Sequence, residues 1–104
     1  MMYGLETVDL ERIIAVFRSF PSVERAILYG SRAKGNYRDG SDIDICLVGP
    51  LLNLSVMNDI AQNIYDLNLP YLFDLSVYHQ ISNPDLQEHI NRAGATLFDR
   101  KALG

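Results

Sequence analysis

Two segments of the chain place apolar side chains at every second position, and this pattern limits the fold more than any other feature. The segment "DIDICLV" spans residues 42–48, and "YLFDLSVY" spans residues 71–78. Side chains of a β-strand alternate between its two faces, so each segment predicts a strand with one wholly apolar face, which helices should cover. The opposite face carries aspartate, namely Asp42 and Asp44 in the first strand and Asp74 in the second.

Apolar residues three and four positions apart predict helices around these strands. Thr7 is the expected N-cap of the first helix, and Asn83 precedes a proline suited to the first helical position. The 104 residues suffice for one core, so we expect a single domain, 1–104, of the α/β (α+β) class, with a small mixed β-sheet and helices packed on one face. The helices are expected over Thr7–Phe20, Ser55–Leu67 and Pro84–Ala93, and the strands over Ala26–Tyr29, Asp42–Val48, Tyr71–Tyr78 and Thr96–Phe98.

Composition narrows the classes of function. The net charge of −4 disfavours sequence-independent binding to a nucleic-acid backbone. Charged residues interrupt the N-terminal segment, so it does not read as a signal peptide, and no apolar run is long enough to span a bilayer. Cys46 is the only cysteine, which excludes an internal disulfide and a cysteine-based metal site. We therefore expect a cytoplasmic protein that binds neither nucleic acid nor membrane.

The three aspartates predict a metal site if their strands are neighbours. Adjacent strands lie about 4.8 Å apart, so Asp42, Asp44 and Asp74 would then converge on the open face of the sheet. Carboxylates at that range repel one another and lose hydration unless a cation lies between them. Ligands that are all oxygen favour Mg²⁺, with Mn²⁺ as the alternative. Two such ions are used for in-line phosphoryl or nucleotidyl transfer.

A Gly-Ser turn follows the strand Ala26–Tyr29 and supplies the complementary half of such a site. Gly30 allows close approach of the backbone, and the amides after it can point at phosphate oxygens. The Ser31 hydroxyl adds a hydrogen bond, and Arg32 and Lys34 offer positive charge. The turn therefore predicts binding of a nucleoside triphosphate by Gly30, Ser31 and Arg32, with Lys34 as a solvated neighbour.

The complete stretch resembles a known signature. Gly30-Ser31, ten residues and then Asp42-Ile43-Asp44 is similar to the Gly-Ser, spacer, Asp-x-Asp pattern of the polymerase-β-like nucleotidyltransferase superfamily. The "GSRAKG" start and the chain length look most like the minimal nucleotidyltransferases (MNT) of bacteria and archaea. The resemblance covers nearly the whole chain and implies the palm-type core of that superfamily.

The resemblance also implies roles for individual residues. Asp42 and Asp44 would hold the metal ions. Asp74, in "LFDLSV", matches the third carboxylate of the family, which shares a metal and can act as base for the incoming hydroxyl. A basic residue directly after the serine, here Arg32, is usual in the shorter members.

Family members of this size imply a partner and a reaction. They are commonly encoded beside a small helical HEPN protein, in a pair that resembles a toxin–antitoxin module. The chain would transfer AMP from ATP to a tyrosine of the HEPN toxin and so act as an antitoxin, within a homo- or hetero-oligomer. The alternative is a non-catalytic, nucleotide-binding antitoxin that neutralises its partner by complex formation. An antibiotic-modifying nucleotidyltransferase is disfavoured, because those enzymes build the acceptor pocket in a second domain.

Overall fold

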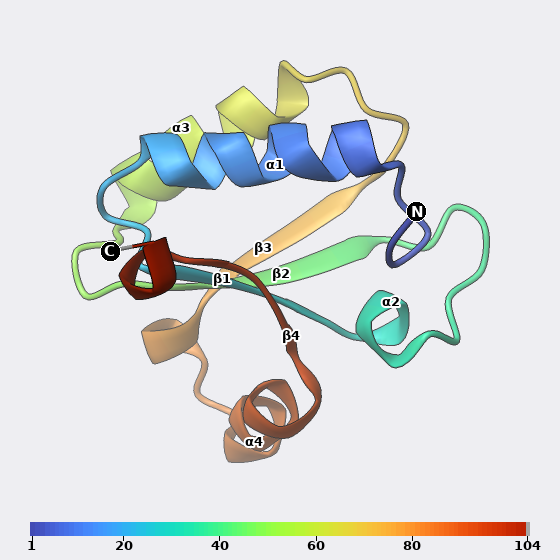
Figure 1. The fold of residues 1–104 in the computed structure, drawn as a ribbon. Coiled ribbons are helices and arrows are strands. Elements are labelled where there is room, and N and C mark those ends of the chain that lie inside the picture. Colours follow the sequence, from blue (N-terminus) through green and yellow to red (C-terminus); the bar gives the residue numbers. More distant parts are fainter. Residues whose placement is uncertain (104) are drawn as a thin grey trace.

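The computed structural model describes residues 1–103 and contains one four-stranded sheet with helices on both faces (Figure 1). Helices α1 and α3 lie side by side on one face, and α4 lies on the other. The helices are α1 (Thr7–Ser19), α2 (Ser31–Lys34), α3 (Leu54–Tyr65) and α4 (Pro84–Ala93), with 3-10 turns η1 (Tyr78–Gln80) and η2 (Arg100–Leu103). The strands are β1 (Arg25–Tyr29), β2 (Ile43–Val48), β3 (Phe73–Val77) and β4 (Ala95–Asp99).

The strands follow the order β3-β2-β1-β4 across the sheet. Strand β1 runs antiparallel to β2 and β4, whereas β2 and β3 run parallel and are joined by the α3 crossover. The predicted mixed sheet of an α/β domain is therefore confirmed. The helices were predicted on one face only, but α4 covers part of the other face, where Ile90 packs against Ile27 and Cys46. The two strands that carry aspartate are neighbours, which was the condition for a shared site.

Several element boundaries differ from the predictions. Strand β2 begins at Ile43, so Asp42 lies just outside it, although the Ile43 amide donates to the Leu72 carbonyl at 2.8 Å and aligns the two strands. Thr7 was predicted as N-cap of α1 but is its first helical residue, and Glu6 is the N-cap. At α4 the prediction is confirmed, because the Asn83 side chain accepts a hydrogen bond from the amide of Asp85.

Gly94 is the C-cap residue of α4. Its φ of −72° is open to any residue. The glycine is needed for another reason, since a Cβ there would lie 2.5 Å from Ile27 Cγ2 and 2.4 Å from the Ile90 carbonyl oxygen. Close packing of the end of α4 against β1 therefore explains this glycine.

The main core lies between the sheet and the pair α1 and α3. Both helices present one apolar face, as their periodicity predicts. Burying such a face contributes about 25 cal/mol per Å² of apolar surface. The fully buried side chains include Ile13 and Phe17 of α1, Ile60 of α3, Leu28 of β1, and Ile43, Ile45 and Leu47 of β2.

The opposite face of the sheet is only partly covered. Ile27, Cys46 and Ile90 form a second, smaller apolar cluster where α4 packs on β1 and β2. Burial raises the pKa of the Cys46 thiol. The helix leaves the part of this face around Asp44 and Asp74 accessible, because Asp44 is half-buried and Asp74 is exposed.

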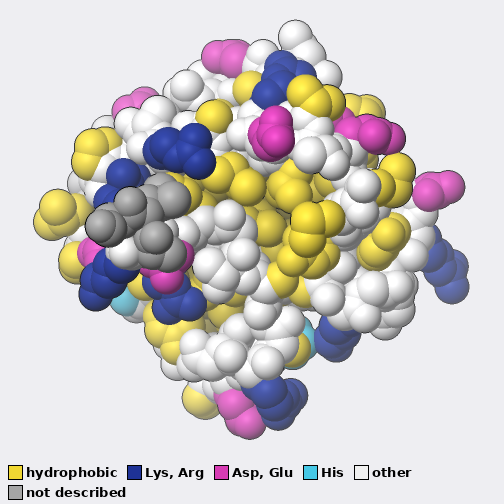
Figure 2. Space-filling model, in the orientation of Figure 1, with side chains coloured by type: hydrophobic (Ala, Val, Ile, Leu, Met, Phe, Trp, Pro, Cys, Tyr) yellow, Lys and Arg dark blue, Asp and Glu magenta, His cyan; other side chains and the backbone are white. Residues whose placement is uncertain are grey.

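Figure 2 shows the molecule from the side of β4. Apolar side chains gather beneath α1 on this face, while Lys and Arg side chains lie around the periphery. Among residues 1–103, none of the helices combines the length and the apolar character that crossing a membrane requires.

Candidate active site

The aspartates of β2 and β3 lie side by side on the partly open face of the sheet. In the parallel register Asp44 is the Cα partner of Asp74, so their side chains point to the same side. Asp42 lies two residues before Asp44 and is exposed at the entry to β2. The structure therefore brings Asp44 and Asp74 together on rigid strands and places Asp42 at their margin.

The electrostatics of these carboxylates suit a cation. Partial burial raises the pKa of Asp44, and the negative charges of Asp74 and then Asp42 raise it further. A divalent cation would relieve this repulsion, and a set of carboxylate oxygens fits Mg²⁺ or Mn²⁺. Over residues 1–103, however, no group of three or more His, Cys, Asp or Glu side chains is close enough to form a ready-made metal cluster. Metal binding by Asp42, Asp44 and Asp74 stays a prediction.

The Gly-Ser turn is packed directly against the Asp44 carboxylate. Gly30 has φ 78° and ψ −154°, a conformation essentially restricted to glycine, and a Cβ there would lie 2.5 Å from Asp44 Oδ2. Ser31 then begins α2, and the first amides of a helix have no acceptor within it. The backbone of Gly30, directly before these amides, therefore lies against the Asp44 carboxylate. Phosphate binding by Gly30 and Ser31 stays a prediction.

Substituting Gly30 by alanine should damage the fold and the site together. Strain at positive φ and the clash with Asp44 should lower the free energy of unfolding by about 2–3 kcal/mol and weaken ATP binding by at least roughly 10-fold. Thermal unfolding and calorimetry with Mg-ATP measure the two effects.

Gly35→Ala is the matched control for this substitution. Gly35 also has positive φ, at 86°, but in the described part of the chain nothing lies within 4 Å of the position that a Cβ would take there. The free energy of unfolding of the Gly35→Ala variant should fall by only about 1 kcal/mol, and the variant should keep its affinity for nucleotide. Equal nucleotide affinity in the Gly30→Ala variant and the unmodified chain would contradict a phosphate-binding turn at Gly30.

Arg32 occupies a different place from the one predicted. Its side chain is only 3% exposed, and it donates hydrogen bonds to the Ser41 carbonyl from Nε at 3.1 Å and from Nη2 at 2.8 Å, and to the Tyr3 carbonyl from Nη1 at 2.8 Å. The rings of Tyr37 and Tyr71 each lie 5.3 Å from its guanidinium carbon. The structure thus assigns Arg32 to the framework that joins the N-terminal turn to the loop before Asp42, whereas the sequence predicted a contact with the nucleotide.

Two further polar residues lie on this face, and neither was predicted as a site residue. Tyr29 is the β1 partner of Asp44, and Ser76 follows Asp74 on the same face of β3. Burial raises the pKa of the Tyr29 hydroxyl, the nearby Ser76 hydroxyl offsets part of the rise, and the charges of Asp74 and Asp44 add to it. Within the described residues Ser76 Oγ is buried without a hydrogen-bond partner. Alternation along β1 is the signal that could have placed Tyr29 here.

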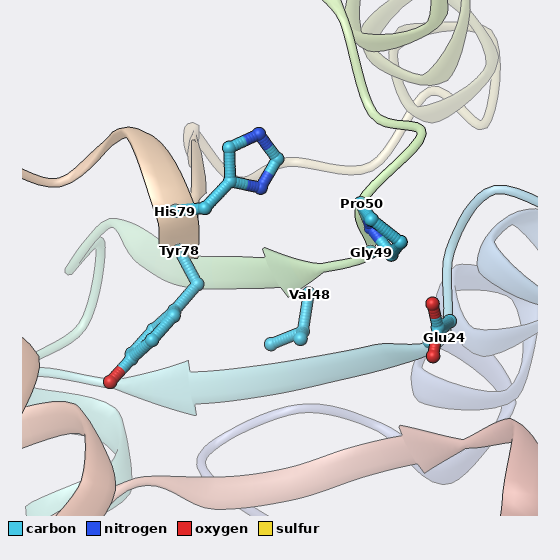
Figure 3. Close-up of a pocket in the computed structure, with 6 residues that line it drawn as sticks. All are labelled: Glu24, Val48, Gly49, Pro50, Tyr78 and His79. Atoms are coloured by element: carbon cyan, nitrogen blue, oxygen red, sulfur yellow. The ribbon is translucent and has the colours of Figure 1, made fainter.

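A pocket of about 340 Å³ lies elsewhere on the molecule (Figure 3). It is formed where β2 ends, by Val48, Gly49 and Pro50 together with Glu24, Tyr78 and His79. The carboxylates lie at the other end of β2, where the strand begins, so this pocket is separate from the candidate site.

A Gly-Ser turn after β1 and two carboxylates on the parallel neighbours β2 and β3 match the arrangement that the sequence predicts for a nucleotidyltransferase. The chain belongs to the polymerase β nucleotidyltransferase family, whose sequence model matches residues 11–103. No curated protein sequence matches the chain.

Solved structures with the same fold come from toxin–antitoxin complexes. One, a toxin–antitoxin with AMP-PNP, has a TM-score of 0.72 and 24% identity over 86% of this chain and 73% of that chain. Another contains a tri-AMPylated Shewanella oneidensis HEPN toxin in complex with an MNT antitoxin, with a TM-score of 0.69 and 20% identity over 94% of this chain and 76% of that chain. A third, the MntA-HepT complex, has a TM-score of 0.68 and 20% identity over 93% and 75%. At these identities the likeness shows the fold.

Proposed function

We propose that the chain transfers AMP from ATP to a hydroxyl group of a partner protein, a tyrosine of a HEPN toxin, and thereby acts as an antitoxin. The observation that carries the proposal is the contact between the Gly30 turn and Asp44, since it joins a phosphate-binding backbone to the carboxylate pair Asp44 and Asp74. Similar folds in complexes with AMP-PNP and with an AMPylated HEPN toxin support the choice of nucleotide and partner.

The roles of the residues follow from their positions. Asp42, Asp44 and Asp74 would hold divalent cations, which neutralise charge on the triphosphate when bound. The amides after Gly30 and the hydroxyl of Ser31 donate hydrogen bonds to phosphate oxygens and orient the nucleotide.

Asp74 lies on the outermost strand, where an acceptor can reach it. Its carboxylate accepts the proton of the acceptor hydroxyl. The acceptor oxygen forms a bond to the α-phosphorus as the bond from that phosphorus to the bridging oxygen breaks, and pyrophosphate leaves. The products are the AMP-modified acceptor and pyrophosphate.

The proposal is tested by incubating the chain with labelled ATP, Mg²⁺ and the HEPN protein encoded beside it. We expect the HEPN protein to gain the label and the mass of one AMP group per transfer, and to lose its toxicity. Asp74→Asn is the control, because it removes the base while keeping the size of the side chain. A complex that forms and neutralises the toxin without any gain in mass would refute transfer and establish the non-catalytic antitoxin.

A further inference from the structure

Tyr29 lies on the same face of the sheet as the two carboxylates. The strand registers place three residues in one row across this face, namely Tyr29 of β1, Asp44 of β2 and Asp74 of β3. The next row on the same face consists of Ile27, Cys46 and Ser76. The Tyr29 side chain packs against the small apolar cluster to which Ile27 and Cys46 belong. Its ring therefore lies over the second row, directly beside the carboxylates.

The hydroxyl of Tyr29 reaches toward the outer strand β3. The Ser76 hydroxyl lowers the pKa of this phenol, against the larger rise from burial, and the charge of Asp74 raises it more than the charge of Asp44 does. Both Ser76 and Asp74 belong to β3, which lies roughly 10 Å from β1, on the far side of β2. The phenol of Tyr29 thus spans β2, and its hydroxyl lies closer to the carboxylate of β3 than the position of Tyr29 on β1 suggests.

The two carboxylates differ in how the chain supports them. Asp44 is half-buried, and its Oδ2 lies against the backbone of Gly30. Asp74 is exposed on the edge strand, where the sheet continues on one side only. Carboxylates that bind a metal ion commonly accept a hydrogen bond from a second residue, which fixes their orientation. Asp74 is therefore the carboxylate that needs such a support.

Ser76 gives the Tyr29 hydroxyl a reason to lie at β3. Within the described residues Ser76 Oγ is buried without a hydrogen-bond partner, and a buried hydroxyl without a partner costs free energy. Ser76 follows Asp74 by two residues on the same face. From there its hydroxyl can donate to the Tyr29 oxygen and leave the Tyr29 O–H free to donate to Asp74.

We propose that Tyr29 is a positioning residue for Asp74. Its hydroxyl donates a hydrogen bond to the Asp74 carboxylate when that carboxylate holds a divalent cation, and Ser76 holds the phenol in place. The hydrogen bond occupies one carboxylate oxygen and leaves the other to face the cation. The inference rests on the proposed function in so far as it takes Asp74 as a cation ligand.

Tyr29→Phe tests the inference with Mn²⁺ as the probe. Phenylalanine keeps the ring that packs on the sheet and removes only the hydroxyl, so the fold should stay intact. We expect the affinity for Mn²⁺, measured by electron paramagnetic resonance in the presence of AMP-PNP, to fall by about 10-fold or more. In the transfer reaction the Mg²⁺ concentration for half the maximal rate should rise by a similar factor, and saturating Mg²⁺ should restore most of the rate. Ser76→Ala should weaken Mn²⁺ binding in the same direction, but by less.

Tyr78→Phe is the matched control. Tyr78 packs against the same apolar cluster, but its hydroxyl accepts a hydrogen bond from Asn91, a residue of α4. The Tyr78→Phe variant should bind Mn²⁺ as the unmodified chain does. A second comparison uses the Asp74→Asn background, in which Tyr29→Phe should cause no further loss of Mn²⁺ affinity, because Tyr29 acts through that carboxylate.

Unchanged Mn²⁺ affinity in the Tyr29→Phe variant would overturn the inference. An equal loss in the Tyr78→Phe variant would overturn it too, since the effect would then belong to the apolar cluster as a whole. The same holds if Tyr29→Phe costs as much affinity in the Asp74→Asn background as in the unmodified chain. Failure of the proposed function gives a different result. Mn²⁺ binding would still depend on Tyr29 and support the inference, but the HEPN protein would gain no AMP.

Discussion

Replacing Asp44 by asparagine should abolish AMP transfer and leave the fold intact. Asparagine keeps the size of the side chain but removes the charge that would hold a divalent cation beside the Gly30 turn. Because nucleotidyl transfer depends on positioning and electrostatics, we expect the rate to fall by at least roughly 10³-fold. The measurement is label transferred from ATP at saturating Mg²⁺, and Asp42→Asn should behave in the same way.

The same substitution should slightly stabilise the metal-free protein. Since the pKa of Asp44 is raised in the folded state, the folded protein holds this proton more tightly than the unfolded chain. Protonated Asp44 therefore stabilises the folded state at low pH, and this stabilisation is lost as the pH rises through the folded-state pKa. At neutral pH the ionised carboxylate lowers the free energy of unfolding. Asp44 is substantially solvated, so we expect a gain of only about 0.5 kcal/mol, or roughly 2–4 °C in Tm.

Asp39→Asn serves as the control for both measurements, because Asp39 is an exposed residue of the preceding turn. It should change neither transfer nor Tm. Full activity of the Asp44→Asn variant under metal-replete conditions would show that Asp44 is no metal ligand. A large fall in Tm on the same substitution would show that its carboxylate is stabilising instead.

Alternation along the chain was enough to predict the faces of β2 and β3, because side-chain direction in a strand is a local property. Their pairing was not local, since it depends on the α3 crossover that returns the chain parallel to β2. For this reason Asp44 and Asp74 could be proposed as neighbours only on the condition that their two strands pair. The glycine at position 30 was predictable from its motif, although its contact with Asp44 required the structure.

Arg32 shows where local reasoning fails. Its position after Gly-Ser suggested a phosphate ligand, but α2 has a single turn, and the direction of a side chain there depends on what surrounds it. The carbonyl of Tyr3 and the ring of Tyr71 come from segments far away in sequence. No pattern within residues 30–44 predicts that these segments enclose the guanidinium.

Arg32→Ala should therefore destabilise the protein, because it removes the side chain that joins the N-terminal turn to the loop before Asp42. It leaves the partly buried carbonyls of Tyr3 and Ser41 without their charged donor and removes the contacts with two tyrosine rings. We expect a loss of about 3–4 kcal/mol, a large fraction of the stability of a small domain, and a fall in Tm of roughly 12–25 °C. Arg32→Lys should recover only part of this, because an ammonium group cannot reproduce the fork of donors.

Arg38→Ala is the matched control, since Arg38 is exposed in the same loop and should change the free energy of unfolding by no more than about 0.5 kcal/mol. Nucleotide binding separates the framework role from a ligand role. Measured well below its Tm, the Arg32→Ala variant should keep most of its affinity for Mg-ATP while its transfer rate falls, because Asp42 directly follows the anchored Ser41. An unchanged Tm together with a 10-fold or greater loss of ATP affinity would make Arg32 a phosphate ligand after all.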